Sequence, residues 1–133
     1  MLFGAEHVQR YRETGGEEGH DWQGTQTLIL TTTGRKSGEE RSTPLIYGRL
    51  GEDYLIVASK GGADAPPAWY LNLEAKPEAE IQVRADRFKV RSRVATPEEK
   101  PDAWRTMVGE WPAYDEYQEK TDREIPVVVL ERA

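Results

Sequence analysis

The sequence predicts an α+β fold in which about six mostly antiparallel strands curl into a barrel with the helices packed outside it. Two observations lead to this prediction. Apolar, β-branched runs separated by short turns occupy residues 27–59, residues 79–95 and the C-terminus. Helical patterns lie between these runs, so strands precede, flank and follow helices in a chain of 133 residues, the length of one ordinary domain.

The N-terminal part is predicted to contain a short helix and a flexible connector. Residues 4–13 have a helical pattern, and the segment ETGGEEGH that follows is rich in glycine. We therefore divide the chain into an N-terminal segment, residues 1–24, and a barrel domain, residues 25–133.

Three strand-like runs come next. TLILTTT, residues 27–33, is β-branched and ends at Gly34, and RSTPLIYGRL, residues 41–50, contains Pro44, which is typical of an edge strand or a bulge. YLIVAS, residues 54–59, reads as a strand buried on both faces. Because short turns join the three runs, we expect an antiparallel meander.

The second half of the chain alternates helices and strands. PAWYLNLEAK, residues 67–76, opens with proline, which a first helical turn tolerates, and residues 79–95 predict two strands with a turn near Asp86. Thr96 and Glu99 have the spacing of a capping box before a helix. PAYDEYQEKT predicts a second short helix, and IPVVVLER a closing strand.

Composition excludes several classes of function. The chain has no cysteine and two histidines, so we expect no thiolate nucleophile and no metal site. Its net charge of −6 argues against a nucleic-acid partner. No apolar run approaches the ~20 residues of a membrane helix, and no signal peptide is visible, so a cytoplasmic location is expected. Leu2, Phe3 and Val8 leave open a peripheral membrane contact or a closure of the N-terminus over a site.

The turn GRKSGEER is the first candidate site. Gly34 and Gly38 permit a backbone in which successive N–H groups point at one anion, and basic side chains and a serine hydroxyl surround them. The small hydroxyls of Ser42 and Thr43 continue this polar lining into the next strand. An ordinary charged hairpin turn explains the same spacing.

Three further patterns each have a functional and a structural interpretation. VASKGG, residues 57–62, ends a buried strand beside two glycines, which suits a flat ligand or a plain strand exit. Trp69 and Tyr70 can wall a planar ring or belong to the core. Trp111, Tyr114 and Tyr117 share one helix face, as a pocket lid or as packing.

Arg87, Lys89, Arg91 and Arg93 alternate along one strand, which is typical of a solvated outer face.

Three stretches together resemble the deazaflavin-dependent nitroreductase family, oxidoreductases of actinobacteria that use coenzyme F420. The stretches are TTTGRKSGEERSTPL, LIVASKGGADAPPAWYLNLEAKP and WPAYDEYQEKTDREIPVVVLE, and the similarity runs from about residue 25 to residue 132. The resemblance implies a split β-barrel related to the flavin-mononucleotide-binding split barrels. It also implies a cofactor whose phosphodiester and glutamate tail make one end polyanionic.

The resemblance implies roles for individual residues as well. The GRKSG turn and the arginine after it hold the tail, the next strand runs beside the cofactor, and the VASK and AWYLN segments line it. The implied cofactor-binding residues are Arg35, Lys36, Ser37, Arg41, Ser42, Thr43, Pro44, Leu45, Ile46, Val57, Ala58, Ser59, Lys60, Ala68, Trp69, Tyr70, Leu71, Asn72 and Tyr114. The implied catalytic residues are Ser59, Tyr114 and Tyr117, and the implied substrate-binding residues are Ile46, Trp111 and Tyr117.

We therefore predict an F420-dependent oxidoreductase that transfers a hydride to a quinone, a nitroaromatic or another electron-poor conjugated acceptor, as a monomer or homodimer. The nitroreductases of the family have tyrosine at the positions of Ile46 and Trp111, which bears on whether nitroimidazoles are substrates. One alternative is a flavin-mononucleotide-binding reductase with the same barrel. Another is a non-catalytic module that binds the cofactor or an apolar ligand.

Overall fold

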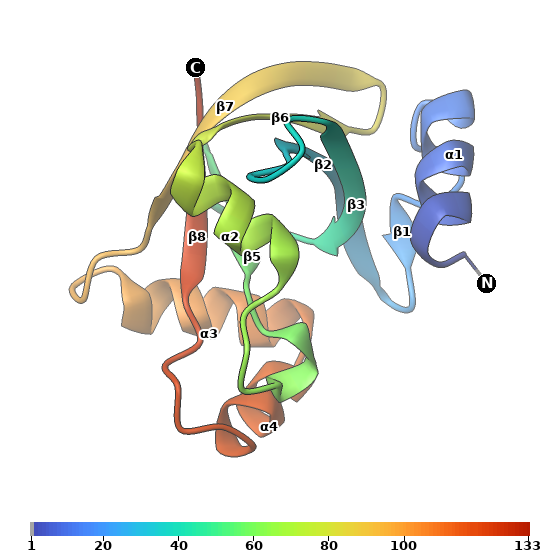
Figure 1. The fold of residues 1–133 in the computed structure, drawn as a ribbon. Helices are drawn as coiled ribbons and strands as arrows, with labels where there is room; N and C mark the ends of the chain where they lie inside the picture. Colours follow the sequence, from blue (N-terminus) through green and yellow to red (C-terminus); the bar gives the residue numbers. More distant parts are fainter. Residues whose placement is uncertain (1) are drawn as a thin grey trace.

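The computed structural model describes residues 2–133 and has one curled antiparallel sheet with helices around it (Figure 1). The helices are α1 (Gly4–Thr14), α2 (Ala68–Ala75), α3 (Lys100–Glu110) and α4 (Ala113–Glu119), with a short 3-10 helix, η1 (Lys60–Gly62). The strands are β1 (Asp21–Trp22), β2 (Thr25–Thr33), β3 (Glu40–Ile46), β4 (Gly48–Leu50), β5 (Asp53–Val57), β6 (Glu78–Val83), β7 (Asp86–Val94) and β8 (Val127–Arg132). The predicted α+β split barrel is confirmed.

The order of the strands differs in part from the expected meander. The sheet runs β1-β2-β6-β7-β8-β5-β4, and β3 pairs with β2 outside this path. The run at residues 41–50 is two strands, because the chain changes partner at Tyr47, whose ring is buried in the barrel. β5 pairs antiparallel with β4, so the second and third runs pair as the meander predicts, although only residues 48–50 of the second run take part. The pairing of β5 with β8 on its other side is an addition to the meander. The interpretation of Pro44 was right, since β3 lies at a sheet edge.

Two hydrophobic clusters lie on opposite sides of β5 and β8. Inside the barrel, Ile56 and Leu130 pack with Leu28, Ile81 and Val90. Because side chains alternate along a strand, the neighbouring residues of both strands face the other way. That second cluster consists of Leu55, Val57, Ala95, Ala103, Met107, Tyr114, Ile125, Val127 and Val129, which join β5 and β8 to α3 and α4. The prediction that residues 54–59 are buried on both faces is confirmed.

The N-terminal segment is folded against the barrel. Tyr11 of α1 is fully buried, and its hydroxyl donates to the Thr27 carbonyl and accepts from the Arg84 N–H, both at 2.9 Å. The connector expected to be flexible is a series of turns, in which Gly16 N–H donates to the Tyr11 carbonyl and His20 N–H donates to the Gly16 carbonyl. The two-residue strand β1 had no signal in the sequence and comes from pairing with β2.

Local sequence patterns in the second half are reproduced. Thr96 and Glu99 exchange both bonds of the capping box, at 2.9 and 3.2 Å, in the turn that enters α3. On β7, Arg87 and Arg91 pair with carboxylates of β6, so the alternating cations form a solvated ionic face. None of the helices within residues 2–133 is long and apolar enough to cross a membrane.

Candidate functional site

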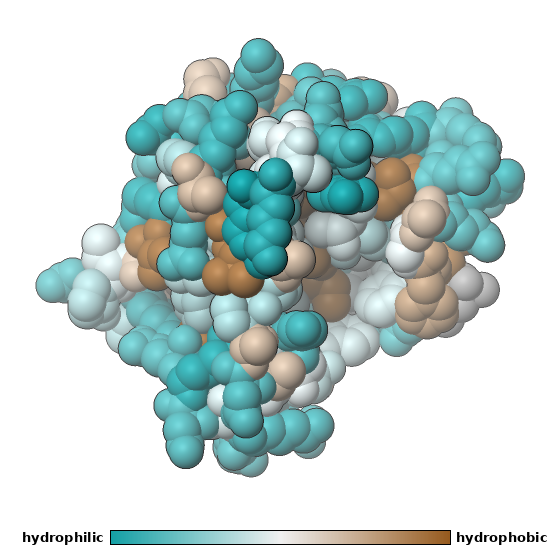
Figure 2. Space-filling view, viewed as in Figure 1, coloured by the Kyte–Doolittle hydropathy of each residue, from teal (hydrophilic) through white to brown (hydrophobic). Residues whose placement is uncertain are grey.

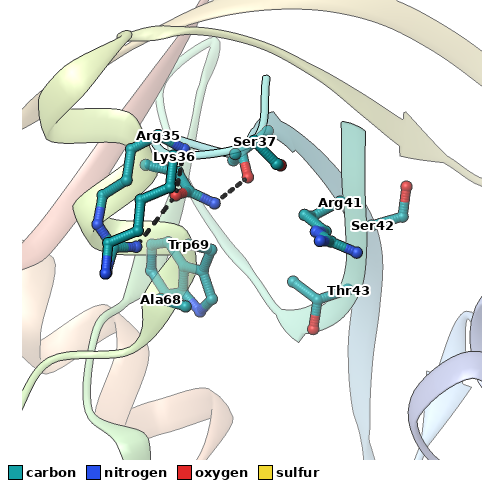
Figure 3. A pocket seen from close by; sticks show the side chains of 11 residues that line it. Arg35, Lys36, Ser37, Arg41, Ser42, Thr43, Ala68 and Trp69 are labelled. Carbon is teal, nitrogen blue, oxygen red and sulfur yellow. Dashed lines mark hydrogen bonds between the residues drawn. The ribbon is translucent and has the colours of Figure 1, made fainter. Parts of the chain in front are cut away.

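A charged cavity of about 410 Å³ lies between the β2–β3 turn and the start of α2. Figure 3 shows Arg35 and Lys36 on one side of it, with Arg41 and Thr43 of β3 on the other and Trp69 below. The lining residues are Thr32, Gly34, Arg35, Lys36, Ser37, Arg41, Ser42, Thr43, Ala68, Trp69 and Asn72. We call it the cationic cavity.

The backbone of the turn is arranged to receive an anion. The Gly34 N–H donates to the Glu39 carbonyl at 2.7 Å and the Gly38 N–H to the Gly34 carbonyl at 2.8 Å, while Gly38 has a left-handed φ of 74°. The N–H groups of Lys36 and Ser37 have no hydrogen-bond partner within residues 2–133. Adjacent free N–H groups in a tight turn form an anion-binding concavity.

The cations of this turn are weakly neutralised. In the described part of the chain, Lys36 has no acidic partner, and Arg41 lies 3.5 Å from Glu39, with both side chains largely exposed. Arg35 contacts a neutral amide, the Asn72 Oδ1, through its Nη1 at 3.3 Å. A bound anion would therefore meet positive charge that the protein itself does not cancel.

Asn72 connects the turn to α2. It is 5% exposed, and its Oδ1 also accepts the backbone N–H of Arg35 at 3.1 Å. Its Nδ2 donates to the Thr32 hydroxyl on β2 at 3.1 Å. The amide thus fixes the start of the turn from two sides, a role that the sequence pattern had not indicated.

A second cavity of about 410 Å³ continues from the first and is mostly apolar and aromatic. Thr43 and Trp69 line both cavities, so the two form one continuous groove. The second cavity is lined by Phe3, Gly4, His7, Trp22, Thr27, Thr43, Pro44, Leu45, Ile46, Val57, Ser59, Lys60, Gly61, Pro67, Trp69, Trp111, Tyr114 and Tyr117. We call it the aromatic slot; Figure 2 shows hydrophobic residues around a hollow in a largely hydrophilic face.

Hydroxyl groups line one wall of the aromatic slot. The Ser59 side chain, just before η1, has no hydrogen-bond partner within the described residues, and neither has the Tyr114 hydroxyl. Burial, followed by the neighbouring Tyr117 and Glu110, raises the pKa of Tyr114, so its phenol stays protonated and able to donate. The Tyr117 hydroxyl accepts from the Trp111 indole N–H at 3.3 Å.

Most of the residues singled out from the sequence meet in this groove. Those that line neither cavity are Ala58, Tyr70 and Leu71. Ala58 is fully buried and its carbonyl accepts from Arg123, while Tyr70 packs against the barrel cluster. Their role as cofactor contacts stays a prediction.

The sequence analysis left open a closure of the N-terminus over a site, but it gave no site role to His7 or Trp22. Phe3 just before α1, His7 of α1 and Trp22 of β1 line the slot, and the Trp22 and Trp111 rings lie 5.9 Å apart. Phe3 is 62% exposed, an unusual position for a large apolar side chain. The aromatic residues near the N-terminus were the signal that the sequence offered, but only the fold brings residues 3–22 to residue 111.

A split barrel with an anion-binding turn beside an aromatic slot is suited to bind an organic cofactor that has an anionic end and a planar ring. The model of the F420H(2)-dependent quinone reductase family matches residues 4–132. The chain belongs to this family of F420-dependent oxidoreductases, which confirms the predicted kinship and cofactor.

Individual proteins agree with the family match. The F420H(2)-dependent quinone reductase Rv1261c of Mycobacterium tuberculosis is 47% identical over 131 residues, which cover 95% of this chain and 87% of the relative. A solved F420-H2-dependent reductase, FDR-A, is 40% identical with a TM-score of 0.73, covering 79% of this chain and 93% of its own. Another structure, described as a domain-swapped dimer, is 36% identical with a TM-score of 0.77. The match covers 95% of this chain and 92% of the other.

Proposed function

We propose that this chain reduces a quinone with a hydride from reduced coenzyme F420, and that nitroaromatics or other electron-poor conjugated compounds are further acceptors. The observation that carries the proposal is the continuous groove, with a cationic cavity at one end and an aromatic slot at the other. An elongated cofactor with an anionic tail and a planar ring matches these two ends. Family membership supports the same assignment.

The cationic cavity fits the tail of the cofactor. Arg35, Lys36 and Arg41 would bind its phosphodiester and glutamates, while the free N–H groups of Lys36 and Ser37 would donate to one anionic group. A single phosphate, as in flavin mononucleotide, needs less charge than this turn provides. The fit therefore favours the deazaflavin cofactor over the flavin alternative.

The aromatic slot fits the ring and the acceptor. When bound, the reduced deazaflavin supplies a hydride. Ser59 and Tyr114 would donate hydrogen bonds to the ring or to charge that develops on the acceptor. Trp69 and Trp111 would keep the two rings in contact and exclude water, and Ile46 and Tyr117 would border the acceptor.

A fluorescence titration with F420 and, separately, with flavin mononucleotide tests the cofactor, followed by turnover with a quinone. We expect tight F420 binding that Arg35→Ala with Lys36→Ala weakens by about a hundredfold or more, because two charge-assisted contacts are lost. Arg105→Ala, an exposed change far from the groove, is the matched control. Preference for flavin mononucleotide would overturn the cofactor assignment. Binding of F420 without turnover of a quinone would overturn the proposed reaction and indicate a non-catalytic module that binds the cofactor.

We also propose a cytoplasmic homodimer with a peripheral membrane contact through Phe3. A structural relative described as a domain-swapped dimer supports the assembly, and the 62% exposed Phe3 at the slot supports the contact. Light scattering of the purified protein and sedimentation with anionic vesicles test them. A monomer, or no vesicle binding, would refute the respective part.

A further inference from the structure

His7 is a buried titratable side chain at the aromatic slot to which neither the resemblance nor the proposed chemistry gives a role. It lies on α1, is 2% exposed and lines the slot together with Phe3 and Trp22. Its ring centroid is 6.2 Å from that of Trp22. The side chain is therefore in the wall that faces an acceptor.

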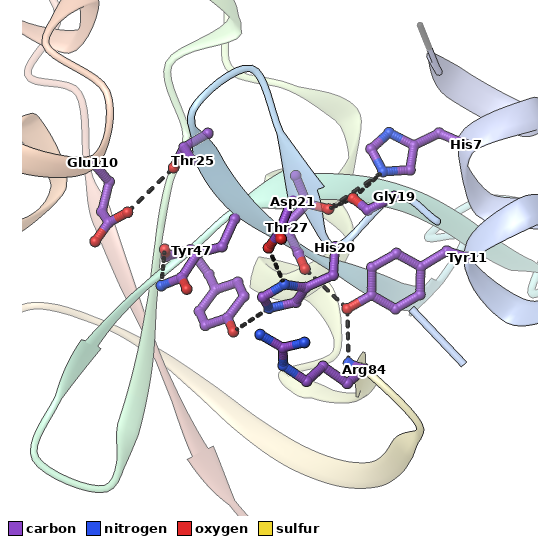
Figure 4. A network of polar contacts seen from close by, with 11 residues as sticks. His7, Tyr11, Gly19, His20, Asp21, Thr25, Thr27, Tyr47, Arg84 and Glu110 are labelled. Atoms are coloured by element: carbon purple, nitrogen blue, oxygen red, sulfur yellow. Dashed lines mark hydrogen bonds and ion pairs between the residues drawn. The ribbon is translucent and has the colours of Figure 1, made fainter. Parts of the chain in front are cut away.

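The hydrogen bonds of His7 fix which of its nitrogens can exchange a proton. Nε2 is 2.8 Å from the Gly19 carbonyl oxygen, which can only accept, so Nε2 carries a hydrogen (Figure 4). The Thr27 hydroxyl also donates to the Gly19 carbonyl oxygen, at 2.6 Å. Its hydrogen is therefore used, so at 3.3 Å from Nε2 the Thr27 oxygen can only accept. Since Nε2 donates in both charge states, a change of protonation falls on Nδ1.

His7 lines the slot, and its Nδ1 has no hydrogen-bond partner within residues 2–133. Every fully buried polar side-chain atom in that part of the chain does have a partner, so Nδ1 is not sealed in the interior. The Cδ2 and Nε2 atoms of His7 are the ring atoms closest to Gly19, since a Cβ added at Gly19 would meet them. Nδ1 is on the opposite edge of the ring and faces away from Gly19.

The carboxylates near His7 are engaged elsewhere. Asp21 pairs with Nδ1 of His20 at 2.8 Å, and Glu18 pairs with Arg10 at 2.7 Å. The other titratable groups around the ring are Tyr11 of the same helix and, from the far walls of the slot, Lys60, Tyr114 and Tyr117. No carboxylate of the described residues forms an ion pair with His7.

We propose that His7 is the general acid that protonates the quinone, an inference that rests on the proposed function. The quinone gains two electrons and one hydrogen as the hydride, which forms an O–H bond at one quinone oxygen as the C–H bond of the hydride donor breaks. The other quinone oxygen is then a phenolate, and it takes its proton from Nδ1 of His7 as the Nδ1–H bond breaks. His7 returns to its acid form by taking a proton from solvent, so the product is a hydroquinone and the charges balance.

The position of His7 suits this role because the two walls of the slot divide the polar groups. Ser59, just before η1, and Tyr114 of α4 belong to one part of the lining, and His7 belongs to α1, which Figure 1 shows well apart from α4. A quinone has carbonyl oxygens at opposite edges of its ring. One edge can meet the hydroxyl wall while the other meets His7.

The variant His7→Gln tests the proposal in the full-length protein. Glutamine keeps an N–H that can donate to Gly19 but has no titrating group. With a soluble quinone we expect kcat to fall about a hundredfold or more at neutral pH, KM to change less than about threefold, and F420 affinity to be unchanged. The wild-type kcat should decline as pH rises through the range in which histidine titrates, and the variant should lose this decline.

The matched control is His20→Gln, which changes the other buried histidine, outside the slot. It should keep the wild-type pH profile. If His7→Gln retains wild-type kcat and its decline with pH, the proposal is wrong while the proposed function stands. If wild-type protein binds F420 and reduces no quinone, the proposed function fails first.

A measurement without turnover covers the case in which His7→Gln does not fold. In wild-type protein labelled at histidine, NMR titration reports the Nδ1 environment of His7 directly. Adding a hydroquinone should shift the His7 resonances and their titration midpoint, and leave His20 unaffected. Unchanged His7 resonances at saturating hydroquinone would overturn the proposal.

Discussion

Asn72 illustrates how one amide can organise a binding turn. Its Oδ1 accepts from both the backbone and the guanidinium of Arg35, at 3.1 and 3.3 Å, while its Nδ2 donates to Thr32. A carboxamide has both an acceptor and donors, so it can bind the turn and the sheet together. Asn72 therefore holds the backbone at the start of the cationic turn and positions the Arg35 guanidinium at the cavity.

We expect Asn72→Ala to weaken F420 binding by about tenfold, or about 1.4 kcal/mol, because the Arg35 backbone loses its anchor. Glu74→Ala, an exposed change on the same helix, should leave the affinity unchanged. The same fluorescence titration measures both variants. An Asn72→Ala protein that is stably folded and binds F420 normally would show that the turn is rigid without the amide.

At the scale of the element, the entrance to α3 combines a capping box with an ion pair. Arg93 of β7 binds both carboxylate oxygens of Glu99, at 2.6 and 2.9 Å, while Glu99 also accepts the Thr96 N–H. The Arg93 bonds, followed by the Thr96 N–H, lower the pKa of Glu99 to about 2. The helix is thus fixed to the sheet at its first turn.

This depressed pKa predicts a pH dependence of stability. The folded state favours ionised Glu99, so its contribution is complete above the usual carboxyl pKa of 4.5 and is lost as pH falls toward 2. Glu99→Gln should therefore lower Tm modestly at pH 7, with a difference from wild type that fades between pH 4.5 and 2. Thermal unfolding at several pH values, with Glu98→Gln as control, measures it; a constant difference would contradict the ion pair.

The sequence predicts a structural element well where interactions between residues close along the chain determine it. The capping box at Thr96 and Glu99 and the edge position of Pro44 follow from short-range rules, and the structure has both. The pairing of β5 with β4 followed from the short turn between them, but its pairing with β8 did not, because that pairing joins residues 54–57 to residues 127–130. Such long-range pairing depends on which apolar faces pack best, and turn lengths do not encode it.

The same limit holds for the candidate site. The cationic turn could be recognised because its residues are consecutive, from Gly34 to Arg41. The N-terminal wall could not, because Phe3, His7 and Trp22 reach the slot only through the docking of α1 on the barrel. A residue's neighbours along the chain say little about a wall that the tertiary structure assembles.

At the scale of the whole molecule, the docking of α1 decides whether the aromatic slot has two walls. Tyr11 is the fully buried side chain of this contact, and its hydroxyl bridges the Thr27 carbonyl of β2 and the Arg84 N–H after β6. Arg12 adds bonds to Thr31 and Ser42 at 3.0 and 3.1 Å. That residues 1–24 form a unit separate from residues 25–133 stays a prediction.

Tyr11→Phe tests the docking. The change leaves a buried carbonyl and a buried N–H without their partner, so we expect the free energy of unfolding to fall by about 1–3 kcal/mol. Tyr54→Phe is the matched control, since Tyr54 is buried in the barrel and its hydroxyl has no hydrogen-bond partner within residues 2–133. Urea unfolding measures both, and hydrogen exchange should become faster in α1 than in β5. Equal stability of the two variants would mean that apolar contacts alone hold α1 against the barrel, and the slot would then keep its N-terminal wall without the Tyr11 bridge.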